Sequence, residues 1–150
     1  MARALIVGCG CRGRVLGGEL LARGWAVRGT SRRGEGLVAI EGAGIEPAKA
    51  DPAQPGTVLD LVGDVTALVW LLGSAIGTEE ELERLHGASL ERVLERLVET
   101  PVRRFVYEAD GSVGSPLQVG AQIVRTAAQR WKIPAIAPKT VRASDIAKLG

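Results

Sequence analysis

The feature that most constrains the fold is a glycine motif that follows the first apolar run of the chain. Residues 4–7 lead into Gly8, Gly10 and Gly13, which have the spacing G-x-G-x-x-G. A helix-like segment comes next, and a second apolar run over residues 25–29 follows it. This order of strand, glycine turn, helix and strand is typical of the first unit of a parallel sheet with crossover helices. The motif therefore predicts an α/β protein.

The rest of the chain continues this alternation of strands and helices. The run at residues 67–72 is apolar without alternation, as expected for a strand covered on both faces. We expect a Rossmann-type, doubly wound parallel sheet of about six strands in three α/β/α layers, with strand order 3-2-1-4-5-6. A single domain over residues 1–150 and a polar tail after Pro138 complete the expectation. The expected strands are 4–7, 25–29, 45–50, 67–72, 104–107 and 133–137, and the expected helices are 12–23, 37–40, 57–62, 78–99 and 117–131.

Composition excludes several classes of protein. The 150 residues are 46 % hydrophobic, which is enough to form a core. The net charge is +2, aromatic residues make up 3 % of the chain and no Lys/Arg block occurs, so a nucleic-acid surface is not expected. No apolar run reaches the length of a membrane span. Cys9 and Cys11 lie too close together for an unstrained disulfide, and we see no leader sequence, so we expect a cytoplasmic protein.

The glycine loop has the chemistry of a phosphate site. The first glycine permits a sharp turn, the second leaves room for a pyrophosphate at the backbone, and the third allows close packing of the helix on the sheet. Backbone N–H groups and the positive end of the helix dipole then face the phosphates. Cys11 and Arg12 fill the variable positions before Gly13. The alternative is a glycine-rich turn that binds nothing.

The end of the second expected strand indicates which dinucleotide would bind. An Asp or Glu that bonds the ribose hydroxyls stands there in NAD-binding versions of the motif, whereas this chain has Thr30, Ser31, Arg32 and Arg33. Arginine can hold a 2′-phosphate through charge-assisted bonds, and the two hydroxyls can add donors. We therefore expect NADP in preference to NAD. The alternative is a pair of solvated arginines.

At this point the chain resembles the short-chain dehydrogenase/reductase superfamily, in particular its extended and atypical, epimerase-like members. The resemblance implies that Gly8, Gly10 and Gly13 lie at the pyrophosphate and that Arg32 and Arg33 lie at the 2′-phosphate. It also places Asp51 near the adenine and Gly73 and Ser74 along the cofactor. The likeness rests on residues 4–13 with 27–33, on Asp51 after 45–50, and on 67–75 and 102–113.

The chain departs from this superfamily at the residues that usually perform catalysis. The usual Tyr-x-x-x-Lys pair is missing, because Tyr107 is the one tyrosine and position 111 is glycine. Tyr107 also falls on an expected buried strand, which favours a core role. Glu108 and Ala109 stand where the active-site serine is usual, and the sequence ends before the substrate-binding segment of larger members.

Other residues are candidates for catalysis or redox chemistry. Glu108, Asp110 and Ser112 follow the fifth expected strand, where a carboxylate could act as a base or bind substrate, although Asp-Gly is also an ordinary turn. A thiol at Cys9 or Cys11 could sense redox state, or these could be small side chains tolerated in a tight loop. We expect His86 on the surface and no metal site.

Three functions stay open on the sequence alone. The chain could bind NADP(H) and sense nucleotide state, without the usual dehydrogenase site and with a protein as partner. It could instead be an NADP-dependent oxidoreductase or epimerase-like enzyme acting on a small molecule, with an atypical site near residues 73–75 and 108–115. A dimer could complete such a pocket. Finally, it could be a scaffold module that binds no nucleotide, because fold analogy does not decide function.

Overall fold

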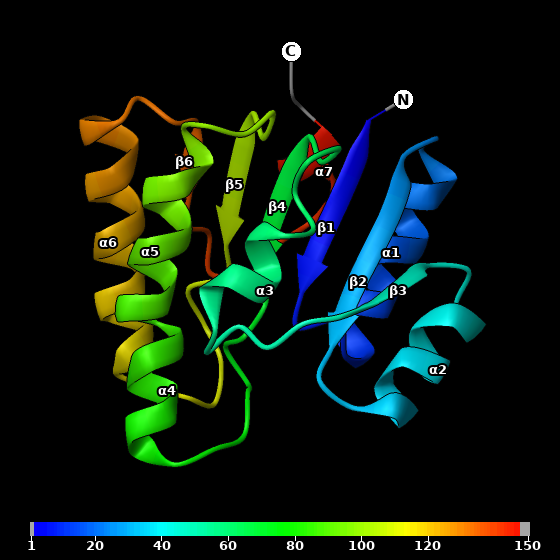
Figure 1. Ribbon diagram of the computed structural model, residues 1–150, viewed down its shortest axis with the longest axis horizontal. Coiled ribbons are helices and arrows are strands. Elements are labelled where there is room, and N and C mark those ends of the chain that lie inside the picture. The colour runs from blue at the N-terminus through cyan, green and yellow to red at the C-terminus, as the bar shows by residue number, and fades with distance from the viewer. Residues whose placement is uncertain (1, 148–150) are drawn as a thin grey trace.

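The computed structural model describes residues 2–147, which form a six-stranded parallel sheet flanked by helices (Figure 1). The strand order is β3-β2-β1-β4-β5-β6, and every neighbouring pair is parallel. The expected Rossmann-type sheet and its strand order are therefore confirmed. The strands are β1 (Arg3–Val7), β2 (Ala26–Ser31), β3 (Glu46–Lys49), β4 (Ala67–Trp70), β5 (Arg104–Tyr107) and β6 (Ala135–Ile136). The helices are α1 (Cys11–Ala22), α2 (Gly34–Gly42), α3 (Pro55–Leu59), α4 (Glu79–Leu85), α5 (Ala88–Leu97), α6 (Pro116–Arg130) and α7 (Ala143–Ala147).

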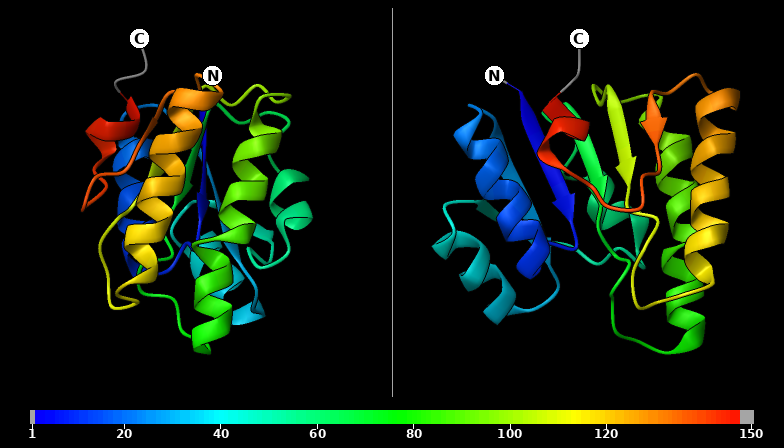
Figure 2. Two further views of the ribbon diagram at one scale, coloured as in Figure 1. Left: turned by 90° about the vertical axis from the view of Figure 1, so that its left-hand side faces the viewer. Right: turned by 180° about the vertical axis from the view of Figure 1, so that it is seen from behind.

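The helices form two layers, one on each face of the sheet (Figure 2). Alternate residues of β1 divide between these layers, because successive side chains of a strand point to opposite faces. Leu5 and Val7 pack with residues of α3, α4, α5 and α6, whereas Ala4 and Ile6 pack with residues of α1, α2 and α7. Since both faces are covered, the central strand β4 is apolar and buried throughout. No helix within residues 2–147 is long and apolar enough to span a membrane.

Helix α1 ends at Ala22, close to the end of the helix expected over residues 12–23. Gly24 has φ +86°, and its N–H donates to the carbonyl of Leu21 at 3.0 Å. This left-handed residue is typical of helix C-termini, because glycine adopts it without a steric penalty. On the buried face, Gly17 lies against the side chain of Ile45, so the helix sits close to the sheet. Val15 lies away from that face and is 65 % exposed.

The helix expected over residues 78–99 is two helices, α4 and α5. Thr78 caps α4, because its side-chain oxygen accepts the N–H of Glu81 at 3.1 Å. The chain then breaks at Gly87, which is the N-cap of α5. A side chain at Gly87 would lie 2.7 Å from the carbonyl oxygen of Glu83, so the break requires glycine.

The break between α4 and α5 turns His86 inward, and the expectation of a surface histidine is wrong. His86 is 0 % exposed. Its Nε2 lies 3.0 Å from the carbonyl oxygen of Leu72, and its Nδ1 lies 2.7 Å from the hydroxyl of Tyr107. A carbonyl only accepts, so Nε2 carries the proton and the tyrosine hydroxyl donates to Nδ1. Tyr107 is itself fully buried, which confirms its core role, and Gly120 leaves room for its ring.

The segment after β6 is more ordered than a polar tail. It crosses to the α1 face of the sheet and forms α7, whose contacts are with α1 and β5. Val141, Ala143 and Ile146 are buried there. The polar residues between them hid this apolar pattern in the sequence.

Cys9 fills a small space in the core. Its side chain is 4 % exposed and lies between Gly13 and Gly29, where a side chain on Gly29 would come within 2.6 Å of the Cys9 sulfur. Burial raises the pKa of this thiol to about 11, against a smaller lowering by Arg14. Cys11 is exposed at the start of α1. The two cysteines therefore differ in access to solvent.

We predict that the free energy of unfolding decreases as the pH is lowered, because of the buried histidine His86. Burial lowers the pKa of His86 below its usual 6.5. Above pH 6.5 the imidazole is mostly neutral in both the folded and the unfolded chain. As the pH falls below 6.5, the unfolded chain binds a proton at this histidine, whereas the folded chain does not until a lower pH. The free energy of unfolding, measured in urea between pH 7.5 and 5.5, should therefore drop by up to about 1.4 kcal/mol per pH unit. His86→Gln should flatten this slope, and an unchanged slope would contradict the assignment.

We also predict that one thiol of the native protein reacts with a chromogenic disulfide reagent and that two react in denaturant. Cys11 is accessible, whereas Cys9 is buried with a raised pKa. Counting the released chromophore checks this result. The Cys11→Ser variant serves as the control and should show no prompt reaction. Labelling of Cys9 at the rate of Cys11 is the outcome that contradicts the packing described above.

Candidate functional site

The parallel sheet brings the loops that carry most of the candidate residues to one edge. The loops after β1, β2, β4 and β5 begin at Gly8, Arg32, Leu71 and Glu108, and all of these strands end on the same side. The order reverses between β1 and β4, because the chain runs outward to β3 and then returns to the other side of β1. In open α/β sheets, the crevice at such a switch point is where ligands bind.

The three glycines of the loop differ in whether the fold requires a glycine at their position. Gly8 has φ +85°, and a side chain there would lie 2.5 Å from the carbonyl oxygen of Leu71. Gly13 packs against Ile6 and Cys9, so it lets α1 approach the sheet. Gly10 has φ −85°, and a side chain there would meet nothing within 4 Å. The fold itself thus needs Gly8 and Gly13, but it does not need Gly10.

The first turn of α1 faces this edge. Gly10 is the N-cap residue and supplies no side chain to accept a bond from the helix N–H groups. The first turn contains no acidic residue either. Because the leading N–H groups of a helix carry a partial positive charge, this terminus has the properties of an anion site.

Thr30 supports the glycine loop through two hydrogen bonds. It is 1 % exposed, and its hydroxyl accepts the N–H of Gly8 at 3.2 Å. Its carbonyl oxygen accepts the N–H of Cys9 at 3.1 Å. These bonds tie the loop after β1 to the end of β2, so the structure gives Thr30 a supporting position rather than an exposed one.

The basic residues after β2 project into solvent. Arg32 and Arg33 are exposed, and the nearest carboxylate to Arg33, Glu35, lies 3.9 Å away with most of its side chain in water. Such an exposed pair is weak, so the arginines stay available. Ser31 accepts the N–H of Arg33 at 3.2 Å, which fixes the turn into α2.

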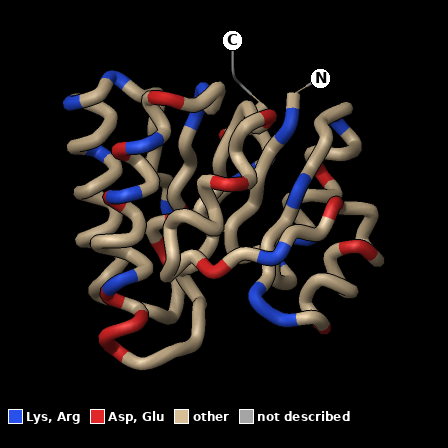
Figure 3. The backbone as a smooth tube through the Cα atoms, viewed as in Figure 1, with Lys and Arg blue, Asp and Glu red and all other residues tan. Residues whose placement is uncertain are grey.

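Lys49 is a residue that the sequence analysis missed at this place. It is exposed and lies beside Ser31 in the register of β2 with β3. Figure 3 shows positively charged segments close together where these two strands end. The only signal for Lys49 in the sequence was its position at the end of an expected strand.

Asp51 follows β3 and folds back on its own loop. Its Oδ1 accepts the N–H of Ala53 at 3.0 Å, and its backbone N–H donates to the hydroxyl of Thr57 at 2.9 Å. One carboxylate oxygen therefore stabilises the turn into α3. Asp51 follows Ala50, whose N–H donates to the carbonyl oxygen of Ser31 at 3.2 Å, so Asp51 lies near the carboxyl end of β2.

The loops after β4 and β5 pack directly on each other. Gly73 faces the backbone of Asp110 and Gly111, with no room for a side chain on either glycine. The carbonyl oxygen of Gly73 accepts the N–H of Val113 at 2.9 Å. Ser74, Asp110 and Ser112 are exposed on these loops. The structure thus brings together the two segments in which the sequence suggested an atypical active site.

Glu108 occupies a different environment from its neighbours in the sequence. It is 3 % exposed, and one carboxylate oxygen forms an ion pair with the guanidinium of Arg12. The other oxygen accepts the backbone N–H of Val141 at 3.1 Å. Both oxygens are therefore engaged, and the sequence could not reveal this pairing because the partners are far apart along the chain.

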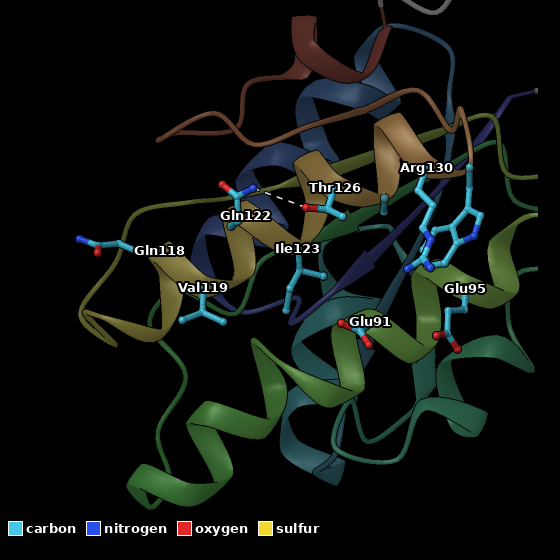
Figure 4. A pocket seen from close by; sticks show the side chains of 10 residues that line it. Glu91, Glu95, Gln118, Val119, Gln122, Ile123, Thr126 and Arg130 are labelled. Carbon is cyan, nitrogen blue, oxygen red and sulfur yellow. Dashed lines mark hydrogen bonds between the residues drawn. The ribbon is translucent and has the colours of Figure 1, made fainter.

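The surface of residues 2–147 includes two cavities of several hundred Å³. One of about 320 Å³ lies beside the glycine loop, between α1 and the chain after β6, and Arg12, Val15, Leu71 and Val141 are among its walls. The other, of about 500 Å³, lies between α5 and α6 and contains none of the candidate residues (Figure 4). No group of three metal-ligating side chains occurs within residues 2–147.

Comparisons with known proteins agree with the fold. No protein-family model and no curated protein sequence matches the chain. Among solved structures, it is similar to a triphenylmethane reductase from Citrobacter sp. complexed with NADP(H), at 18 % identity and TM-score 0.63, over 88 % of this chain and 47 % of that one. It is also similar to a UDP-glucuronic acid 4-epimerase from Bacillus cereus in complex with NAD, at 13 % identity and TM-score 0.68, over 89 % and 54 %.

A third similar structure is a short-chain dehydrogenase from Streptomyces avermitilis, at 22 % identity and TM-score 0.67, over 91 % of this chain and 63 % of that one. The chain spans about half the length of several of these proteins. The protein therefore has the Rossmann fold shared by these short-chain dehydrogenase, reductase and epimerase structures.

Proposed function

We propose that this protein binds a nicotinamide dinucleotide at the carboxyl edge of its sheet, with NADP(H) preferred over NAD(H). The pyrophosphate would lie at the first turn of α1, beside Gly10, Cys11, Arg12 and Gly13. The bound molecule would supply hydride-transfer chemistry. Two of the similar structures contain NADP(H) or NAD, which supports a dinucleotide of this class.

The observation that carries the proposal is the open space at Gly10. Neither backbone conformation nor packing within residues 2–147 demands a glycine there. A phosphate that approaches the backbone does demand one, because a side chain would stand between it and the N–H groups. The free helix terminus behind Gly10 supplies the attraction.

The preference for NADP(H) follows from the charges at the end of β2. Arg32 and Arg33 are exposed, Arg33 has a weak ion pair with Glu35, and Lys49 lies on the neighbouring strand beside Ser31. An adenosine 2′-phosphate beside this cluster would gain charge-assisted bonds. A dinucleotide without that phosphate would gain nothing from them.

The same geometry favours a binding or sensing role over ordinary dehydrogenase catalysis. Tyr107 is buried against His86, and Glu108 is paired with Arg12, so neither side chain faces a substrate. Asp110 and Ser112 are exposed beside Gly73 and remain the candidates for an atypical oxidoreductase or epimerase-like site. Oxidation of bound NADPH by a carbonyl compound would favour that alternative.

Calorimetric titration of the nucleotide-free protein with NADPH and then with NADH tests the proposal. We expect binding of both, with NADPH the tighter. Binding of neither would contradict the proposal and favour the scaffold alternative.

We predict that the Arg32→Ala/Arg33→Ala double variant loses its preference for NADPH. Removing two charge-assisted contacts should weaken NADPH binding by at least about tenfold and leave NADH binding nearly unchanged. The Arg92→Ala/Arg96→Ala double variant removes the same charge from the exposed face of α5 and controls for net charge. An equal loss for both nucleotides in the Arg32/Arg33 variant is the result that refutes the 2′-phosphate assignment.

We predict that Gly10→Ala folds normally but binds either nucleotide at least about tenfold more weakly, which corresponds to about 1.4 kcal/mol. The new methyl group meets nothing in the protein itself but occupies the approach of the phosphate. Gly18→Ala is the matched control, because Gly18 is exposed on the same helix with nothing within 4 Å. Unchanged affinity of Gly10→Ala, measured by calorimetry with thermal unfolding as the fold check, contradicts the assignment.

A further inference from the structure

The chain between β6 and α7 crosses the carboxyl edge of the sheet beside the glycine loop (Figure 2). We call residues 137–142 the strap. Two hydrogen bonds join it to the end of β5: the N–H of Ala109 donates to the carbonyl oxygen of Pro138 at 2.9 Å, and the N–H of Val141 donates to Glu108 at 3.1 Å. After the strap, Ala143 and Ile146 of α7 are buried against the sheet. The strap is thus a short connection anchored at both ends.

Glu108 connects three parts of the molecule. It directly follows β5, its carboxylate accepts the N–H of Val141 in the strap, and it pairs with Arg12 of α1. Its carboxylate is almost completely buried. Within residues 2–147, Arg12 is the one cation that forms an ion pair with it. Because a buried charge is tolerated only when it is paired, the environment of Glu108 depends on Arg12.

Arg12 stands in the first turn of α1, where the proposed pyrophosphate would lie. Its side chain is 56 % exposed, so part of the guanidinium faces solvent while one nitrogen contacts Glu108. A guanidinium binds phosphate readily and in a planar, bidentate manner. A carboxylate on one side and a phosphate on the other would therefore compete for the same group.

We propose that Arg12 and Glu108 form a latch through which dinucleotide binding releases the strap. This inference rests on the proposed function. When Arg12 turns to the phosphate, Glu108 loses its cation and retains only the N–H of Val141. A buried carboxylate without a cation is costly, so local opening of the strap at Val141, which exchanges this one hydrogen bond for water, becomes more favourable. Since coupling between two equilibria is reciprocal, a looser strap also favours the nucleotide.

Release of the strap has a consequence for the neighbouring cavity. Val141 forms one wall of the cavity of about 320 Å³, and Leu16, Leu71 and Val15 contribute apolar surface to it. An opening at Val141 widens this cavity next to the nucleotide. The latch would thus make room for a second molecule only after the dinucleotide has bound.

Hydrogen exchange of the full chain, followed by mass spectrometry with and without saturating NADPH, tests the latch. We expect exchange over residues 137–142 to rise at least about fivefold with NADPH, which is the lower end of ordinary coupling between sites. Exchange in β4, which is buried throughout, serves as the internal reference. In Glu108→Gln, the neutral amide can still accept from Val141 but no longer holds Arg12, so we expect tighter NADPH binding and no response of the strap.

A second set of variants tests the latch without nucleotide. Arg12→Ala should raise exchange over residues 137–142, because Glu108 loses its cation, and adding Glu108→Gln should reverse the rise. Arg14→Ala removes an arginine from the same helix that does not pair with Glu108, and it should change nothing in the strap. Thermal unfolding verifies that each variant is folded.

The outcomes separate this inference from the proposed function. If calorimetry shows NADPH binding while strap exchange stays constant or falls, the coupling is refuted and the proposed function stands. If NADPH does not bind, the proposed function fails and the coupling fails with it. In that case, unchanged exchange in Arg12→Ala would also refute the latch itself, whereas faster exchange would leave a purely structural tie between α1 and the strap.

Discussion

The parallel pairing of β1 between β2 and β4 is the constraint on which the rest of the structure depends. Parallel strands require crossover connections, so helices cover both faces and the central strands contain few polar side chains. The same pairing directs every strand end to one edge. Gly8, Arg32, Gly73 and Glu108 are distant in the sequence, yet the sheet brings the loops that carry them to that edge. A candidate site exists because of this shared direction.

Two buried polar clusters connect loops and helices to this sheet. In one, His86 links the break between α4 and α5 to the carbonyl oxygen of Leu72 and to Tyr107. In the other, Glu108 links β5 to Arg12 and to the strap. Each cluster satisfies its hydrogen-bonding groups, as buried polar atoms require. The first cluster fixes the base of the loop after β4, and the second connects the glycine loop to the chain after β6.

The sequence predicts the fold well where periodicity and glycine chemistry determine local structure. A strand within residues 67–72 and the helix expected over residues 12–23 are confirmed to within two residues, as are the strand order and the buried position of Tyr107. Prediction from the sequence fails where a polar residue contacts a partner that is distant along the chain. His86 has the helical spacing of a surface residue, and only the break at Gly87 turns it inward. The segment after Pro138 also lacks periodicity, although Val141 and Ile146 are buried.

The sequence by itself determined the Rossmann architecture, the glycine loop at the start of α1 and the arginine pair after β2. These features follow from the spacing of nearby residues, which limits the backbone conformations that each segment can adopt. Only the tertiary structure decided that Thr30 supports the loop, that Lys49 lies beside Ser31 and that Glu108 pairs with Arg12. These contacts join residues that lie on different strands and helices. Their geometry arises from the packing of the sheet, and no local pattern in the sequence encodes it.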